Sequence, residues 1–169
     1  LGGRKWSRKH AFETAKVFNE IGDTDFIRLR SLVLRRNSTL RQQAADGEFE
    51  PQSEDEVVDE IALFVESLDC NSYLISDQMS NLLWEVEGDL RRDKQQILRI
   101  IEAYRNLPSL DKLRLRMQRR LEAYVRVYGG LEPRLAGVVR EAVSSLNSGT
   151  PGVNNRVEAA ISTLKEGFI

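Results

Sequence analysis

The chain has 169 residues, of which 41% are hydrophobic and 30% charged, with a formal net charge of −1. This length suits one domain with a buried core, and no stretch reaches the roughly 18 consecutive apolar residues that a membrane-spanning helix needs. The single cysteine, Cys70, excludes an internal disulfide bond, and with only one histidine, His10, a zinc site is not expected. The composition therefore favours the cytoplasm or another reducing compartment.

The charges are segregated along the chain. Residues 48–90 contain thirteen acids and no Lys or Arg, whereas residues 1–47 contain ten bases and five acids, and residues 91–128 contain eleven bases and four acids. Such blocks either pair with one another within the fold or face partners outside it. The sequence leaves both interpretations open.

The N-terminal segment, residues 1–10, places four bases around Trp6. If a membrane span preceded Leu1, this cluster would suit a juxtamembrane anchor, so a membrane tether upstream of Leu1 is one expectation. The apolar spacing then predicts a helix over 7–21 and, after Gly22, a second helix over 25–44. The residues expected on the core faces of these two helices are Ala11, Thr14, Ala15, Phe18 and Ile21, and then Phe26, Leu29, Val33 and Leu40.

Residues 45–52 predict a loop, and the segment 53–68 predicts an acidic amphipathic helix. Ser53 and Glu56 have the spacing of a capping box, in which each side chain accepts a hydrogen bond from the other residue's backbone N–H. The opposite side of this helix is a carboxylate face into which Leu63 projects. The members of this face that we consider for partner binding are Asp59, Glu60, Leu63 and Glu66.

The second half of the chain predicts five more helices, over 77–87, 89–106, 110–128, 133–146 and from 153 onward. The helix over 110–128 has the clearest division between an apolar and a basic side. Its basic side is the second candidate for partner binding and contains Lys112, Arg116, Arg119 and Arg126. Trp6 and Trp84 are expected to be core residues more than interface anchors.

The pattern as a whole predicts an all-α, single-domain bundle of seven to eight amphipathic helices, mostly packed as antiparallel neighbours. Residues 1–146 form the bundle in this prediction. Residues 147–152 are rich in Asn, Ser, Gly and Pro and predict a linker. Residues 153–169 form a last helix that is either packed on the bundle or flexibly attached.

The sequence contains none of the motifs that hold nucleotides, metals or catalytic nucleophiles. We therefore expect no cofactor, no metal and no enzymatic activity. The first functional hypothesis is a non-catalytic protein–protein interaction or scaffold domain that uses its acidic and basic helix faces, including by self-association. The alternatives are a cytoplasmic domain of a membrane-anchored protein, and a nucleic-acid-associated regulatory protein. For the last, the basic helix over 110–128 would contact nucleic acid, and anionic lipid could occupy the same face.

Overall fold

The computed structural model describes residues 3–22, 24–149 and 151–167, and it divides the chain into two units, Leu1–Asn106 and Leu107–Ile169. We call them the N-terminal unit and the C-terminal unit and describe each by itself. The described residues are mostly helical, with seven helices and one sheet of three short strands. The predominance of helix agrees with the sequence-based prediction, whereas the sheet was not predicted.

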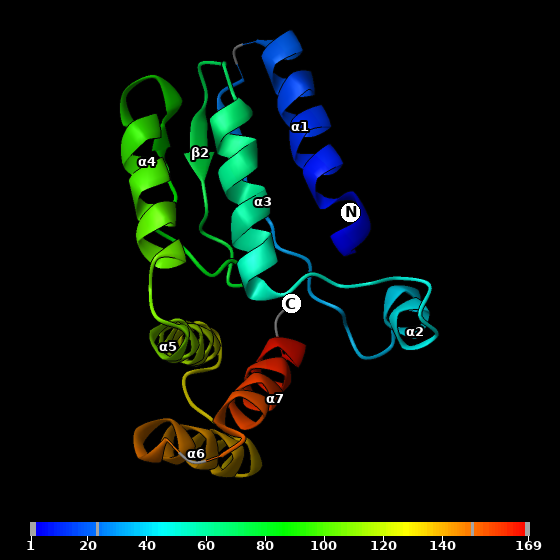
Figure 1. Ribbon diagram of the computed structural model, residues 1–169, viewed down its shortest axis with the longest axis vertical. Helices are drawn as coiled ribbons and strands as arrows, with labels where there is room; N and C mark the ends of the chain where they lie inside the picture. The colour runs from blue at the N-terminus through cyan, green and yellow to red at the C-terminus, as the bar shows by residue number, and fades with distance from the viewer. Residues whose placement is uncertain (1–2, 23, 150, 168–169) are drawn as a thin grey trace. The chain divides into compact units, whose positions relative to one another are not determined.

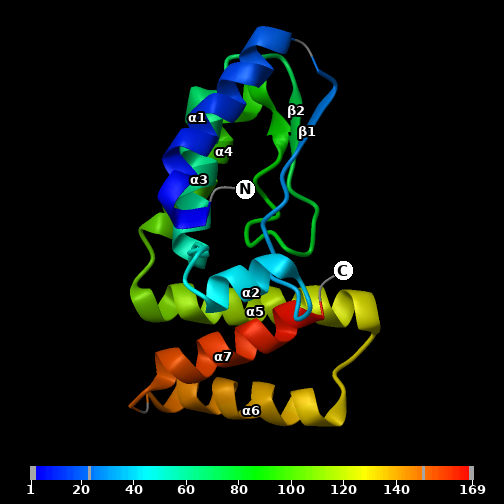
Figure 2. The same ribbon diagram turned by 90° about the vertical axis from the view of Figure 1, so that its right-hand side faces the viewer.

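The N-terminal unit has two layers, one of helices and one of strands (Figures 1 and 2). Helix α3 lies between α1 and α4, and the strands lie behind these helices in Figure 1. Strand β2 is central in the sheet and pairs in parallel with β1 and antiparallel with β3. The elements are α1 (Gly3–Ile21), β1 (Phe26–Arg28), α2 (Thr39–Ala45), α3 (Glu54–Ser67), β2 (Tyr73–Ile75), β3 (Gly88–Asp89) and α4 (Leu90–Arg105).

Helix α3 begins at the predicted capping box. The Ser53 hydroxyl accepts from the Glu56 backbone N–H at 3.2 Å, and the Glu56 carboxylate accepts from the Ser53 N–H at 2.7 Å. Helix α1 approaches α3 closely because Ala11 and Ala15, both 1% exposed, carry only methyl groups at the contact. Ile21, which was expected to face the core, is instead 61% exposed.

The prediction of a helix over residues 25–44 is wrong. Residues Phe26–Arg28 form β1, and the next helix, α2, begins only at Thr39. The N–H of Leu29 donates to the carbonyl of Ile75 at 2.8 Å, and Ile27 is 3% exposed under the helices. Pairing with a strand far along the chain therefore overrides an apolar spacing that fits a helix.

The helix predicted over 77–87 is also wrong, because this segment is a loop between β2 and β3. The prediction that its apolar residues point inward holds for Leu82, Leu83 and Val86, which are buried. A buried asparagine, Asn81, holds the loop against the segment after β1, so the segment is packed without being helical.

The C-terminal unit consists of α5 (Ser109–Tyr128), α6 (Pro133–Ser148) and α7 (Val153–Glu166), and α7 packs against both other helices. Gly129 ends α5 in the left-handed conformation, with φ 75°, and Pro133 occupies the first turn of α6, as its fixed φ favours. The core of this unit contains Leu113, Met117, Val139, Ala142, Leu146, Val157, Ala160, Ile161 and Leu164.

The predicted linker at 147–152 begins inside α6, which ends at Ser148, and residues 149–152 connect α6 to α7, both of which belong to the C-terminal unit. Thr150 of that predicted linker, and residues 168–169 of the predicted last helix, lie outside the described residues. Within the described part of the chain, no helix is both long and apolar enough to cross a membrane.

Candidate interaction surfaces

The acidic residues of α3 lie between α1 and α4 and contact both. Toward α1, Glu56 accepts from the Arg4 guanidinium, with Nε–Oε1 at 2.7 Å. Glu60 contacts His10 Nδ1 at 2.5 Å and accepts from the Gln52 amide at 2.7 Å. Much of the carboxylate face therefore holds the flanking helix in place.

Toward α4, two more carboxylates of α3 are engaged. Asp55 accepts from the Tyr104 hydroxyl at 2.8 Å, and Asp59 lies 2.9 Å from Arg105 Nε. The side chains of Asp59 and Arg105 are 55% and 42% exposed, so this ion pair contributes little stability, about 0–1 kcal/mol. The acidic block of the sequence thus pairs with bases on both sides of it within the N-terminal unit.

The contacts of the capping box change the pKa of Glu56. Burial disfavours the charged form of Glu56, but hydrogen bonds from the Ser53 N–H and from Arg4, together with the Arg4 charge, outweigh it. The pKa of Glu56 therefore lies below its ordinary value. The hydrogen bond to Glu56, together with the charges of Glu50 and Glu56, raises the pKa of Arg4.

The C-terminal end of α3 is capped by its neighbours. The Lys94 ammonium donates to the carbonyls of Glu66 and Leu68 at 3.0 and 2.6 Å, and the Asn19 amide donates to the Ser67 carbonyl at 2.9 Å. These donors satisfy carbonyls that have no partner within the helix. Of the remaining candidate residues on this helix, Leu63 is half-buried and Glu66 is exposed.

The four candidate bases of α5 do not share one exposed surface. Arg116 is 8% exposed and donates to Glu158 of α7 at 2.8 Å, while Arg119 has a 21% exposed side chain that lies 3.7 Å from Glu122. Lys112 is half-buried and Arg126 is exposed. These bases and the acidic residues of α3 belong to different units, and the role of both sets in partner binding stays a prediction.

The outer face of the sheet carries an aromatic pair that the sequence analysis missed. Phe26 and Tyr73 are 64% and 39% exposed, with ring centroids 6.4 Å apart in an edge-to-face arrangement. Their neighbours Ile27 and Leu74 point to the helices and are buried. Strands of three residues are too short for this alternation to stand out in the sequence.

The N-terminal half of α1 carries a second exposed aromatic group, Trp6, which is 49% exposed. The expectation that Trp6 is a core residue is therefore wrong. The ammonium groups of Lys5 and Lys9 lie 5.3 and 5.6 Å from the centre of its ring, within the range of cation–π attraction. Trp84, in the loop between β2 and β3, is half-buried.

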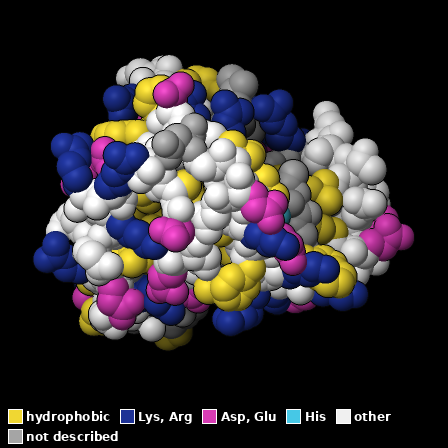
Figure 3. Space-filling model, turned by 90° about the horizontal axis from the view of Figure 1, so that it is seen from above, with side chains coloured by type: hydrophobic (Ala, Val, Ile, Leu, Met, Phe, Trp, Pro, Cys, Tyr) yellow, Lys and Arg dark blue, Asp and Glu magenta, His cyan; other side chains and the backbone are white. Residues whose placement is uncertain are grey.

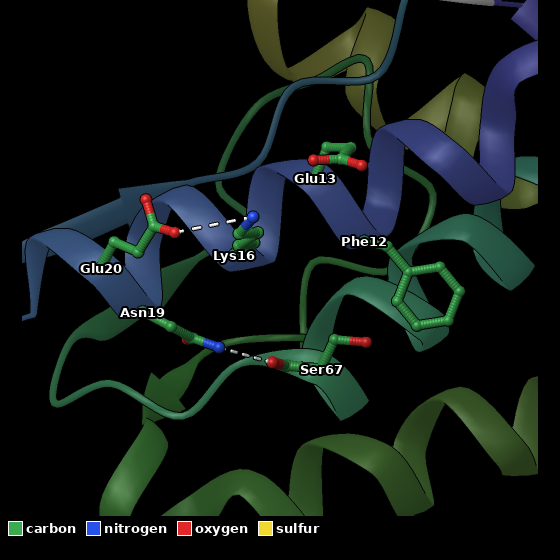
Figure 4. A pocket seen from close by; sticks show the side chains of 6 residues that line it. All are labelled: Phe12, Glu13, Lys16, Asn19, Glu20 and Ser67. Atoms are coloured by element: carbon green, nitrogen blue, oxygen red, sulfur yellow. Dashed lines mark hydrogen bonds and ion pairs between the residues drawn. The ribbon is translucent and has the colours of Figure 1, made fainter.

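An open hollow of about 540 Å³ lies between α1 and the end of α3 (Figure 4). Its polar groups largely engage one another, since Lys16 lies 3.8 Å from Glu20 and Asn19 donates to the Ser67 carbonyl. Phe12, 47% exposed, forms its apolar part. The lining residues are Phe12, Glu13, Lys16, Asn19, Glu20 and Ser67.

On the face drawn in Figure 3, basic and acidic side chains are interspersed with hydrophobic ones. Segregation along the sequence therefore does not produce a single-sign surface on this face. Within the residues that the structure describes, no group of three or more His, Cys, Asp or Glu is placed to hold a metal ion. Comparison with protein-family models, with curated proteins and with solved structures found no match for this chain.

Proposed function

We propose that this protein is a non-catalytic protein–protein interaction domain that binds an extended, acidic segment of a partner along β1. The observation that carries the proposal is the unpaired edge of this strand. Such an edge offers backbone donors and acceptors to a further strand, which is a general mode of peptide recognition.

Successive residues of β1 direct their backbone N–H and C=O groups alternately toward β2 and toward the open edge. Asp25 accepts from the Tyr73 N–H at 3.1 Å, and Leu29 donates to the Ile75 carbonyl at 2.8 Å. By the two-residue period of a strand, the N–H and C=O groups of Phe26 and Arg28 point the other way. Among the described residues, none of the backbone hydrogen bonds formed outside the sheet's own ladder engages these four groups.

The side chains around this edge favour an acidic segment. Arg28 is paired with Asp77 at 3.1 Å, but Arg30 and Arg35 are exposed and have no ion pair among the described residues. Residues 26–36 contain four arginines and no acid. The exposed Phe26 and Tyr73 rings would contact apolar side chains of the added strand, and the free arginines would contact its carboxylates.

This proposal keeps the class of function expected from the sequence, protein–protein interaction, but it moves the main binding surface from the charged helix faces to the edge of β1. The carboxylates of α3 are largely engaged by α1 and α4, so they support the fold more directly than they offer a docking face. Leu63, Glu66 and the α5 bases remain proposed secondary contacts within a helical scaffold. We place the protein in a reducing compartment such as the cytoplasm, because its only cysteine, Cys70, is a free thiol.

The test is backbone hydrogen exchange measured residue by residue. The probe is a short peptide of alternating glutamate and valine, with a peptide of alternating lysine and valine as its control. We expect the glutamate peptide to slow exchange of the Phe26 and Arg28 amides and to leave Leu29, which already donates to β2, nearly unchanged. The lysine peptide should have no effect.

A matched pair of variants localises the contact. Arg28→Pro removes the outward N–H, whereas Arg28→Ala keeps it and removes only the side chain. Binding should be lost in Arg28→Pro and retained, at reduced affinity, in Arg28→Ala, with circular dichroism confirming that both fold. Undiminished binding to Arg28→Pro would contradict the proposal. Protection of Phe26 and Arg28 that rises with protein concentration alone would assign the edge to a second copy of the chain.

A further inference from the structure

A second surface lies on the N-terminal half of α1, and it runs from Trp6, opposite Ala11 and Ala15, round to Arg8 at the edge of the face that holds them. Its members are all exposed, and we call them the basic–aromatic surface of α1. They come from the first three turns of the helix, so they lie on a single convex element. The members are Lys5, Trp6, Arg8, Lys9 and Phe12.

The charge of this surface is not neutralised within the described structure. Lys5, Arg8 and Lys9 have no ion pair with the described residues, whereas their neighbour Arg4 is held by Glu50 and Glu56. Residues 3–12 contain no acid, and the first acid of the helix is Glu13. The surface is therefore electropositive next to an exposed aromatic ring.

We propose that the basic–aromatic surface of α1 docks the protein on anionic lipid bilayers. This inference is independent of the peptide-binding proposal, because it concerns another element and another class of partner. Tryptophan rings favour the headgroup region of a bilayer, and long lysine and arginine side chains reach lipid phosphates while their stems cover apolar surface.

The shape of the surface favours a bilayer over a folded partner. The roughly half-exposed ring of Trp6 projects from a convex helix beside the ammonium groups of Lys5 and Lys9, and Phe12, which also lines the hollow toward α3, is similarly exposed. A bilayer surface accommodates such a convex set of groups without a complementary groove. The attraction acts over about one Debye length, so it should weaken as salt is added.

The experiment measures partitioning of the whole chain onto vesicles. Trp84→Phe leaves Trp6 as the only tryptophan, so its emission reports on this surface alone. We expect a blue shift on vesicles of phosphatidylcholine with phosphatidylserine, and none on phosphatidylcholine alone. Replacing Lys5, Arg8 and Lys9 together with Gln should lower the partition coefficient about 100-fold, at about fivefold per base.

The control carries the same change in charge elsewhere in the N-terminal unit. Arg91, Arg92 and Arg99 are exposed on α4, and replacing them with Gln should change partitioning by less than about threefold. Trp6→Ala should weaken partitioning while circular dichroism stays unchanged. Equal binding to neutral vesicles, equal loss in both triple variants, or retention of short duplex DNA in place of vesicles would overturn the proposal.

Discussion

The side chain of Asn81 joins two segments that lie fifty residues apart in the chain, with its carbonyl oxygen 2.9 Å from the backbone nitrogen of Ser31. The same oxygen accepts from the Ser31 hydroxyl at 3.0 Å, and the Asn81 amide donates to the Leu29 carbonyl at 3.0 Å. Asn81 is 1% exposed, so little water can take the place of its side chain as the partner of these groups. The contact holds the strand β1 and its continuation against the loop between β2 and β3.

Asn81→Ala should lower the free energy of unfolding by about 2–4 kcal/mol, because it leaves the part-buried N–H of Ser31 and the part-buried carbonyl of Leu29 without their partner. Urea unfolding followed by circular dichroism measures the change. Asn154→Ala, at an exposed position of α7, is the control and should stay within about 0.5 kcal/mol of the parent. Equal stabilities of the two variants would show that the Asn81 contacts are not important in solution.

Ser53→Ala should cost about 1 kcal/mol, because the N–H of Glu56 loses the hydroxyl that caps α3. The urea midpoint of the variant measures this cost. The control is Ser162→Ala, which makes the same chemical change at an exposed position inside α7. Alanine is the better helix former there, so this variant should not lose stability. The prediction fails if the Ser53 variant unfolds at the same urea concentration as the parent.

Glu56 should make stability depend on pH. Its pKa is lowered in the folded state, so its contribution is present above the unfolded value of about 4.3 and is lost as the pH falls through the folded pKa. The stability difference between the parent and Glu56→Gln should therefore be largest near neutral pH and shrink toward pH 3.

The control for this titration is Glu13→Gln, because Glu13 is exposed and has no ion pair among the described residues. At neutral pH this replacement should change the free energy of unfolding by less than about 0.5 kcal/mol. A constant difference for Glu56→Gln over the same range would contradict the assignment of Arg4 and Ser53 as the groups that hold its charge.

Arg116 and Glu158 should couple α5 to α7. Their side chains are 10% and 46% exposed, so the coupling should lie between that of exposed and buried pairs, at about 1–2 kcal/mol. A double-mutant cycle with Arg116→Met and Glu158→Gln measures it, since methionine keeps much of the buried stem. A coupling indistinguishable from zero would show that the two residues contribute independently.

The helices that the sequence predicted correctly have local signals that agree with their packing. The capping box at Ser53 and the apolar stripe of α4, in which Leu90, Ile97, Ile101 and Tyr104 are all buried, are both present in the structure. The same holds for the Pro at the start of α6 and the Gly after α5. Capping and a 3.6-residue period act within a few residues, so the sequence alone determines them.

The strands and the exposed surfaces were decided only by tertiary structure. The apolar spacing of Phe26, Leu29 and Val33 fits a helix, but Leu29 bonds to Ile75 and Asn81, so these residues form a strand and an irregular segment. In the same way, the sequence left open whether the acids of α3 pair within the fold, and most of them contact bases or a hydroxyl of α1 and α4. Local spacing cannot report which distant segment supplies a hydrogen bond or a counter-charge, because those partners are brought together only when the layers pack.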